Sequence, residues 1–166
     1  GMYVHNINVS SQAGNTVSIN RNNATSGWGG GVYLEDGSIT LNNVSISENK
    51  VKKGNSTSIY GGGGLFVKGG SFTINSGSIR NNESDQYGGG VLVYNDQGIK
   101  PITLVNGNIQ QNKAEYGGGI AAYGAFNLTI NNINIENNEA KNGAGIFAKG
   151  INSGSEARLQ YNSGII

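Results

Sequence analysis

Short glycine runs recur along the 166-residue chain, and each is followed at once by an apolar segment. The runs are Gly29–Gly31, Gly62–Gly64, Gly88–Gly90, Gly117–Gly119 and the variant Gly143-Ala144-Gly145. The first apolar residues after them are Val32, Leu65, Val91, Ile120 and Ile146, which are 33, 26, 29 and 26 residues apart. Self-similarity at a period of this length is typical of proteins that stack one structural unit on the next.

Each repeat contains three short segments with the pattern of strands. The coil that starts at Val32 has the segments Val32-Tyr33-Leu34, Ile39-Thr40-Leu41 and Val44-Ser45-Ile46. Alternate residues of a strand face the same side, so the apolar ends of each segment share one face. The pattern predicts an all-β chain, a right-handed single-stranded parallel β-helix (a solenoid) of about six coils with three short strands each. We expect residues 1–166 to form a single domain of this kind, as a fragment of a longer repeat protein.

An asparagine stands three residues after the last isoleucine of the third segment wherever the chain continues. These asparagines are Asn22, Asn49, Asn82, Asn112 and Asn138. The asparagine side chain carries two donors and an acceptor, so asparagines stacked coil on coil can hydrogen-bond along the axis. The spacing therefore predicts a structural asparagine ladder. Arg21 and Glu48 hold equivalent places in adjacent coils, which predicts a surface ion pair.

Composition excludes several classes of partner. The 11 basic and 10 acidic residues are spread along the chain without a basic patch, so we expect no nucleic-acid partner. The absence of cysteine leaves no thiolate metal site, and we expect neither a metal nor a cofactor. No apolar run approaches the roughly 20 residues of a membrane span, so no transmembrane segment is predicted. We expect any export signal to lie outside this sequence.

The glycine runs before an apolar residue and the Ile-x-x-Asn spacing resemble the repeats of chlamydial polymorphic outer-membrane proteins. That family repeats a Gly-Gly-Ala-apolar motif and a Phe-x-x-Asn motif, and the similarity covers nearly the whole chain. Isoleucine replaces phenylalanine in every second motif here, so the resemblance extends to adhesin-like β-helix proteins in general. It implies a pectate-lyase-like fold, a location outside the cell or on its surface, and a host or microbial surface protein or glycan as partner.

The wider pectate-lyase-like fold also includes enzymes that act on polysaccharides, and such lyases need clustered acidic residues beside an arginine or lysine base. The acidic residues here fall mostly in turns. The candidates for catalysis are Arg80, Glu83 and Asp85, with Asp96 in the next coil. We interpret them as solvated turn charges and keep a carbohydrate-active enzyme, or an inactive fragment of one, as the alternative. The only histidine, His5, has no candidate partner cluster.

The first strand of each coil carries an unusual outward column. Its middle residue should point away from the core, yet the column consists of Tyr3, Tyr33, Phe66, Leu92, Ala121 and Phe147. Tyr94 and Tyr123 extend it, and Trp28, Tyr60, Tyr87 and Tyr116 form a second column before the glycine runs. Aromatic columns suit contact with sugar rings or with an apolar partner surface. The binding residues predicted from this pattern are Tyr33, Phe66, Leu92, Tyr94, Tyr123 and Phe147.

The column has more than one interpretation, and so has the function of the protein. Connections of the chain itself, such as that from Lys50 to Tyr60, could fold over the column. Two chains could instead associate through the first-strand face or through the coil ends. The leading hypothesis is a non-catalytic, adhesin-like binding module that recognises a protein or glycan through this face. A purely structural spacer in a surface fibre is the third functional reading, beside the enzyme.

Overall fold

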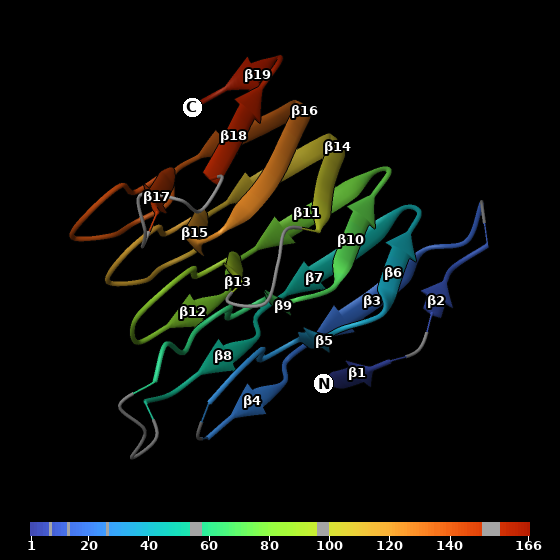
Figure 1. The fold of residues 1–166 in the computed structure, drawn as a ribbon, viewed down its shortest axis with the longest axis horizontal. Coiled ribbons are helices and arrows are strands. Elements are labelled where there is room, and N and C mark those ends of the chain that lie inside the picture. The colour runs from blue at the N-terminus through green and yellow to red at the C-terminus, as the bar shows by residue number, and fades with distance from the viewer. Residues whose placement is uncertain (7, 13, 26, 54–57, 96–99, 151–156) are drawn as a thin grey trace.

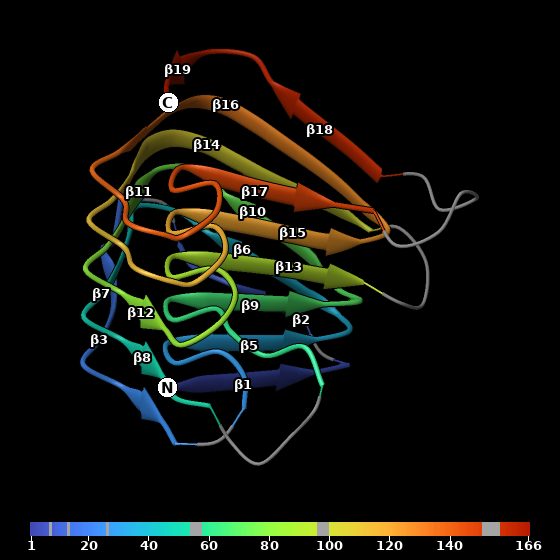
Figure 2. The same ribbon diagram turned by 90° about the vertical axis from the view of Figure 1, so that its left-hand side faces the viewer.

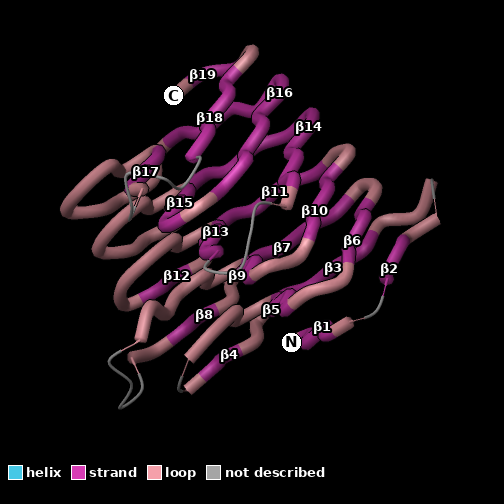
Figure 3. The backbone as a smooth tube through the Cα atoms, in the orientation of Figure 1, coloured by secondary structure: helices cyan, strands magenta, loops and turns pink. Residues whose placement is uncertain are grey.

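The computed structural model describes residues 1–6, 8–12, 14–25, 27–53, 58–95, 100–150 and 157–166. Within these ranges the chain forms strands, turns and bends, and all strand pairs are parallel (Figures 1 and 3). The strands stack coil on coil from the N-terminal to the C-terminal end, as the repeat predicts. The prediction of an all-β parallel solenoid is confirmed. No helix with the length and hydropathy of a membrane span occurs among the described residues.

The first sheet contains the strand that follows each glycine run. Its strands, in stacking order, are β1 (Met2–His5), β5 (Val32–Glu35), β9 (Leu65–Lys68), β13 (Val91–Asn95), β15 (Ile120–Gly124) and β17 (Ile146–Lys149). The register pairs Val32 with Leu65, Leu65 with Val91, and onward through Ile120 to Ile146. The residues that mark the sequence period therefore lie directly above one another.

The second sheet has ten strands and contains the second and third segments of every coil. The second segments are β2 (Asn8–Ser10), β6 (Ser38–Leu41), β10 (Ser71–Ile74) and β18 (Ala157–Tyr161), and the third are β3 (Val17–Asn20), β7 (Val44–Ser47), β11 (Gly77–Arg80) and β19 (Gly164–Ile165). Two longer strands, β14 (Pro101–Gln110) and β16 (Phe126–Glu136), run through both segments and join them into one sheet. The constant three-residue offset between the segments is the reason that both halves keep the same register.

A third, smaller sheet lies after the asparagine position, and the three-segment pattern did not predict it. It contains β4 (Asn23–Ala24), β8 (Lys50–Val51) and β12 (Glu83–Ser84). Isolated bridges continue its stacking from Glu83 to Lys113 and from Lys113 to Glu139. Two-residue strands carry too little alternation to be recognised from a period of two.

The core lies between the sheets and consists of the inward aliphatic and aromatic side chains. Leu34, Ile46, Phe72, Ile120 and Leu128 are among the residues with no more than 1% exposure. The alternation of the second segment is observed directly, because in β6 and β10 the apolar residues are buried while the intervening threonines are only partly buried. One continuous apolar cluster thus runs through the coils, as expected of stacked repeats.

The asparagine ladder closes the turn after the third strand. The first four ladder asparagines each donate from the backbone N–H and from Nδ2 to Oδ1 of the asparagine in the next coil, and Asn138 accepts the last of these bonds. From Asn49 onward, Nδ2 also donates to an isoleucine carbonyl of the preceding coil, as Asn82 does to Ile46 over 3.0 Å. Among the described residues, no buried side-chain polar atom lacks a partner.

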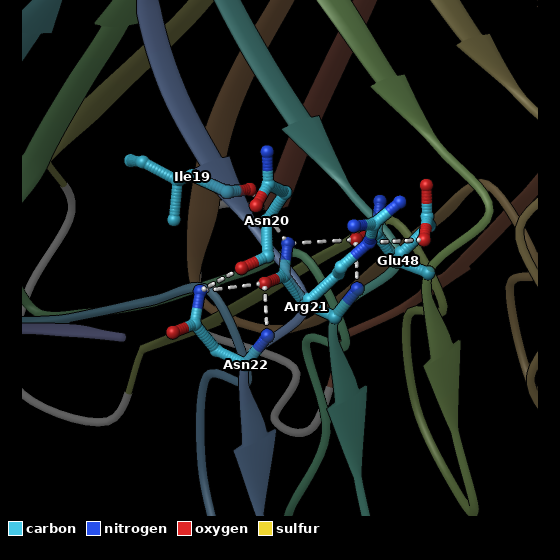
Figure 4. A network of polar contacts seen from close by, with 7 residues as sticks. Ile19, Asn20, Arg21, Asn22 and Glu48 are labelled. Atoms are coloured by element: carbon cyan, nitrogen blue, oxygen red, sulfur yellow. Dashed lines mark hydrogen bonds and ion pairs between the residues drawn. The ribbon is translucent and has the colours of Figure 1, made fainter.

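The residue before each ladder asparagine adopts positive φ and turns its side chain outward. Arg21 and Glu48 have φ values of 55° and 56°, a conformation that non-glycine residues seldom adopt. Figure 4 shows the result at the first two coils, where Nε of Arg21 lies 2.9 Å from Oε2 of Glu48. The predicted ion pair is confirmed. Both side chains are largely exposed, so the pair adds little to the stability.

Candidate binding surface and charged hollow

The centre of the outward aromatic column is covered by the chain itself. Phe66, Leu92 and Ala121 have 0% exposure and form a second apolar cluster outside the first sheet, with Ile59 and Tyr87 packed against it. The covering residues belong to the connections that precede the glycine runs, and Figure 2 shows these connections passing in front of the first sheet. Phe66 and Leu92 therefore cannot contact a partner while the connections are in place. The column therefore points away from the main core, as strand alternation predicts, but at its centre it is covered by connections of the chain itself, which is one of the alternatives considered above.

The aromatic side chains at the first two coils are open. Tyr3 is 61% exposed and Trp28 is 40% exposed, whereas Tyr33 between them is half-buried. The ring centroids of Tyr3 and Tyr33 are 5.2 Å apart in a stacked arrangement, and those of Trp28 and Tyr33 are 5.9 Å apart. The indole Nε1 of Trp28 donates to the carbonyl of Ile59 over 2.8 Å, which fixes the indole against the next coil.

These rings line a hollow of about 450 Å³ together with polar side chains. Arg21 and Asn23 are exposed at its wall, and Asn22 is half-buried there. We call the set Tyr3, Arg21, Asn22, Asn23, Trp28 and Tyr33 the aromatic hollow. Its volume is in the range of small-ligand sites, and its lining combines flat apolar faces with amide and guanidinium groups.

Glu35 lies beside the rings and organises the charges there. Its carboxylate accepts a hydrogen bond from the Tyr3 hydroxyl over 2.9 Å and pairs with Nζ of Lys68 at 3.1 Å. The hydrogen bonds from Lys68 and then Tyr3 lower the pKa of Glu35, so the carboxylate stays charged at neutral pH. Burial, and after it the charge of Glu35, raises the pKa of the Tyr33 hydroxyl. His5 also approaches Glu35, with Nδ1 at 3.7 Å from Oε2.

The upper coils carry a second aromatic group, in which the rings pack mainly on one another. Tyr87 stacks on Tyr116 with a centroid distance of 5.0 Å and meets Tyr123 at 5.5 Å, and Tyr123 meets Tyr94 at 6.2 Å. We call these four residues the tyrosine cluster. Phe147 joins it at 5.2 Å from Tyr116, and Nζ of Lys149 lies 5.6 Å from the Tyr123 ring centroid. All four tyrosines are half-buried.

The carboxylates predicted as catalytic candidates lie in a different place. Glu83 and Asp85 line a hollow of about 350 Å³ on the third sheet, which we call the charged hollow, together with Lys113, Glu115, Glu139 and Lys141. Lys50 pairs with Glu83 at 2.9 Å, Lys113 with Glu139 at 2.6 Å and Lys141 with Glu115 at 3.3 Å. Asp85 accepts a hydrogen bond from the backbone N–H of Lys53.

The remaining catalytic candidates do not join this hollow. Arg80 is exposed at the end of β11 and is not among the residues that line it. Asp96 lies outside the described residues. Within the described ranges, no group of three or more histidine, cysteine, aspartate or glutamate side chains is placed to hold a metal ion.

The predicted binding residues are thus divided between three environments. Tyr33 belongs to the aromatic hollow, Tyr94, Tyr123 and Phe147 belong to or pack on the tyrosine cluster, and Phe66 and Leu92 are buried. Tyr3 and Trp28 are the most exposed aromatic residues among those described, although the binding prediction omitted them. The two aromatic columns in the sequence could have identified these residues, because Tyr3 is the first residue of one column and Trp28 is the first residue of the other.

Comparison with protein-family models, with curated protein sequences and with solved structures gives no significant match to the chain.

Proposed function

We propose that the protein is a non-catalytic, adhesin-like module that acts outside the cell or on its surface and binds a partner through the aromatic hollow. The observation that carries this proposal is the exposure of Tyr3 and Trp28 beside a half-buried Tyr33 and the polar groups of Arg21 and Asn23. Exposed aromatic rings next to hydrogen-bonding groups are characteristic of binding surfaces. The repeat resemblance to surface adhesins supports the same class of function.

The chemistry of the hollow suits a surface glycan or an apolar protein patch. An aromatic ring offers a flat apolar face to either, and an asparagine amide can donate and accept at once. Arg21 pairs with Glu48 through Nε and its side chain is 77% exposed, so its guanidinium group is accessible to a ligand.

The test compares binding of the wild type and of Tyr3→Ala to a glycan array and to a panel of surface-protein ectodomains. Tyr3→Ala should weaken binding at least about tenfold, as loss of a central aromatic contact usually does. Leu159→Ala is the matched control, because Leu159 is 39% exposed on β18 and does not line the hollow. Binding that is unchanged in Tyr3→Ala, or equally weakened in Leu159→Ala, would reject the hollow as the site.

A carbohydrate-active enzyme remains the second candidate, because four carboxylates line the charged hollow. Glycosidic bond cleavage by two carboxyl groups requires a separation of about 5 to 10 Å and a raised pKa on one of them. The double variant Glu83→Gln/Asp85→Asn should abolish any release of reducing ends from polysaccharides if this candidate is right. Activity that survives the double substitution would remove these two residues from the reaction.

A further inference from the structure

The Tyr87 and Tyr116 rings are held face to face by the backbone of adjacent coils. Their centroids are 5.0 Å apart and their planes differ by 25°, the shortest centroid distance among the described aromatic pairs. The two residues form an isolated parallel bridge, and the N–H of Gly88 donates to the carbonyl of Tyr116 over 2.9 Å. The position of one ring over the other is therefore set by main-chain hydrogen bonds as well as by packing.

Two more phenols extend this pair into a connected group. Tyr123 touches Tyr87 and Tyr94 touches Tyr123, so all four rings of the tyrosine cluster are in contact and half-buried. A tyrosyl radical formed on any of them can be passed to its neighbours over these short distances. The chain contains no cysteine, so disulfides cannot join its coils.

We propose that Tyr87 and Tyr116 are a site of oxidative cross-linking, at which a peroxidase with hydrogen peroxide joins two neighbouring coils through a dityrosine bond. Each ring loses one electron and the proton of its hydroxyl, and the two radicals combine at the carbons next to the hydroxyl groups. The two ring hydrogens displaced by the new carbon–carbon bond return as protons to restore the hydroxyls. One hydrogen peroxide accepts the two electrons and two protons and leaves as two molecules of water.

Because the two rings of one chain are already close together, they should couple faster than rings on separate molecules. Two groups fixed in contact react as if at very high local concentration, so the bond within one chain should dominate in dilute solution. The cross-link also closes the chain between residues 87 and 116. Such a closure reduces the conformational freedom of the unfolded state, so the linked protein should unfold at a higher temperature than the unlinked one.

The test treats the full chain at low concentration with peroxidase and hydrogen peroxide, then locates the links by proteolysis and mass spectrometry. The expected product joins the peptides that contain Tyr87 and Tyr116, weighs two hydrogens less than their sum and shows dityrosine fluorescence. Tyr116→Phe should abolish this link, because the phenylalanine ring cannot form a phenoxyl radical. Tyr161→Phe is the control, since Tyr161 lies on β18 outside the tyrosine cluster, and its yield should match the wild type.

Two further measurements keep the result decisive. Circular dichroism of Tyr116→Phe should match that of the wild type, and treatment of the urea-unfolded protein should lose the selective link. A link found only between Tyr3 and Tyr33, whose centroids are 5.2 Å apart, would overturn the proposal. Links formed mainly between two chains, or an equal yield in the unfolded protein, would overturn it as well.

Discussion

The Asn82 side-chain amide donates a hydrogen bond to Oδ1 of Asn112 over 3.0 Å, and the two residues have only 1% and 0% of their surface exposed. The same Oδ1 accepts the backbone N–H of Asn82, while Oδ1 of Asn82 accepts two donors from Asn49. A single side chain thus connects three coils. Because these groups are shielded from water, each of them depends on its ladder partner.

Asn82→Ala should therefore destabilise the protein severely. The substitution removes the acceptor for the N–H and Nδ2 of Asn49 and the donor for the carbonyl of Ile46. Leaving two buried donors without a partner should lower the free energy of unfolding by about 3–5 kcal/mol. Urea-induced unfolding measures this loss. Asn108→Ala is the control, because Asn108 is exposed on β14 and should change stability by no more than about 0.5 kcal/mol. Equal effects of the two substitutions would contradict a structural role for the ladder.

Most of the fold could be predicted from the sequence, because the coils stack in the order and spacing in which the glycine runs recur along the chain. The residues after the glycine runs, such as Val32, Leu65 and Val91, pair in the register that their spacing indicates. The ladder was equally predictable, since one fixed offset from an inward isoleucine puts every asparagine at the same turn. The third sheet was missed, because strands as short as Lys50–Val51 leave no alternation to detect.

The candidate site was harder to predict than the fold. Strand alternation correctly places Phe66 and Leu92 on the side of the strand away from the main core, but exposure also depends on the path of the connections. Those connections fold back and bury both side chains, and no period marks such a path. Tyr3 and Tyr33 stay more accessible at the same position of the first coils. Position within a repeat thus sets the direction of a side chain, and the neighbouring connections decide its contact with solvent.

Partial or complete burial of three tyrosines should make the protein less stable in alkali. Burial is the largest cause that raises the pKa of Tyr33, Tyr60 and Tyr87. In the unfolded chain these hydroxyls ionise near pH 10, whereas in the folded protein they hold their protons to higher pH. The unfolded state then binds fewer protons, so the free energy of unfolding should fall as the pH rises above about 10. Phenolate absorbance of native and urea-unfolded protein measures this difference, and superimposable titration curves would contradict it. Tyr33→Phe should reduce the alkaline loss.

The third sheet carries charges of alternating sign in successive coils, from Lys50 through Glu83 and Lys113 to Glu139. Lys113→Glu would place three glutamates in a row at the spacing of adjacent strands. We expect lower stability at low ionic strength and a recovery as added salt shortens the screening length from about 30 Å to about 3 Å. Thermal unfolding at several salt concentrations measures this change, with Lys113→Gln as the uncharged control. If added salt does not restore the stability of Lys113→Glu, the loss must come from the backbone of the turn and not from its charges.

At the glycine runs, the main chains of adjacent coils lie so close together that a side chain on one would clash with the other. Gly89→Ala tests this close approach. A Cβ at Gly89 would lie 2.5 Å from the carbonyl oxygen of Lys113 and 2.6 Å from that of Gly118, both in the adjoining coil. Because both atoms belong to stacked main chain, neither can move without breaking hydrogen bonds along the sheet. The substitution should lower the free energy of unfolding by at least about 2 kcal/mol.

Ala144 stands at the equivalent position of the last run, where it is exposed. Ala144→Gly should therefore change stability by no more than about 1 kcal/mol. Urea unfolding of both variants decides the matter, because a tolerated Gly89→Ala would show that the coils can separate enough to admit a methyl group.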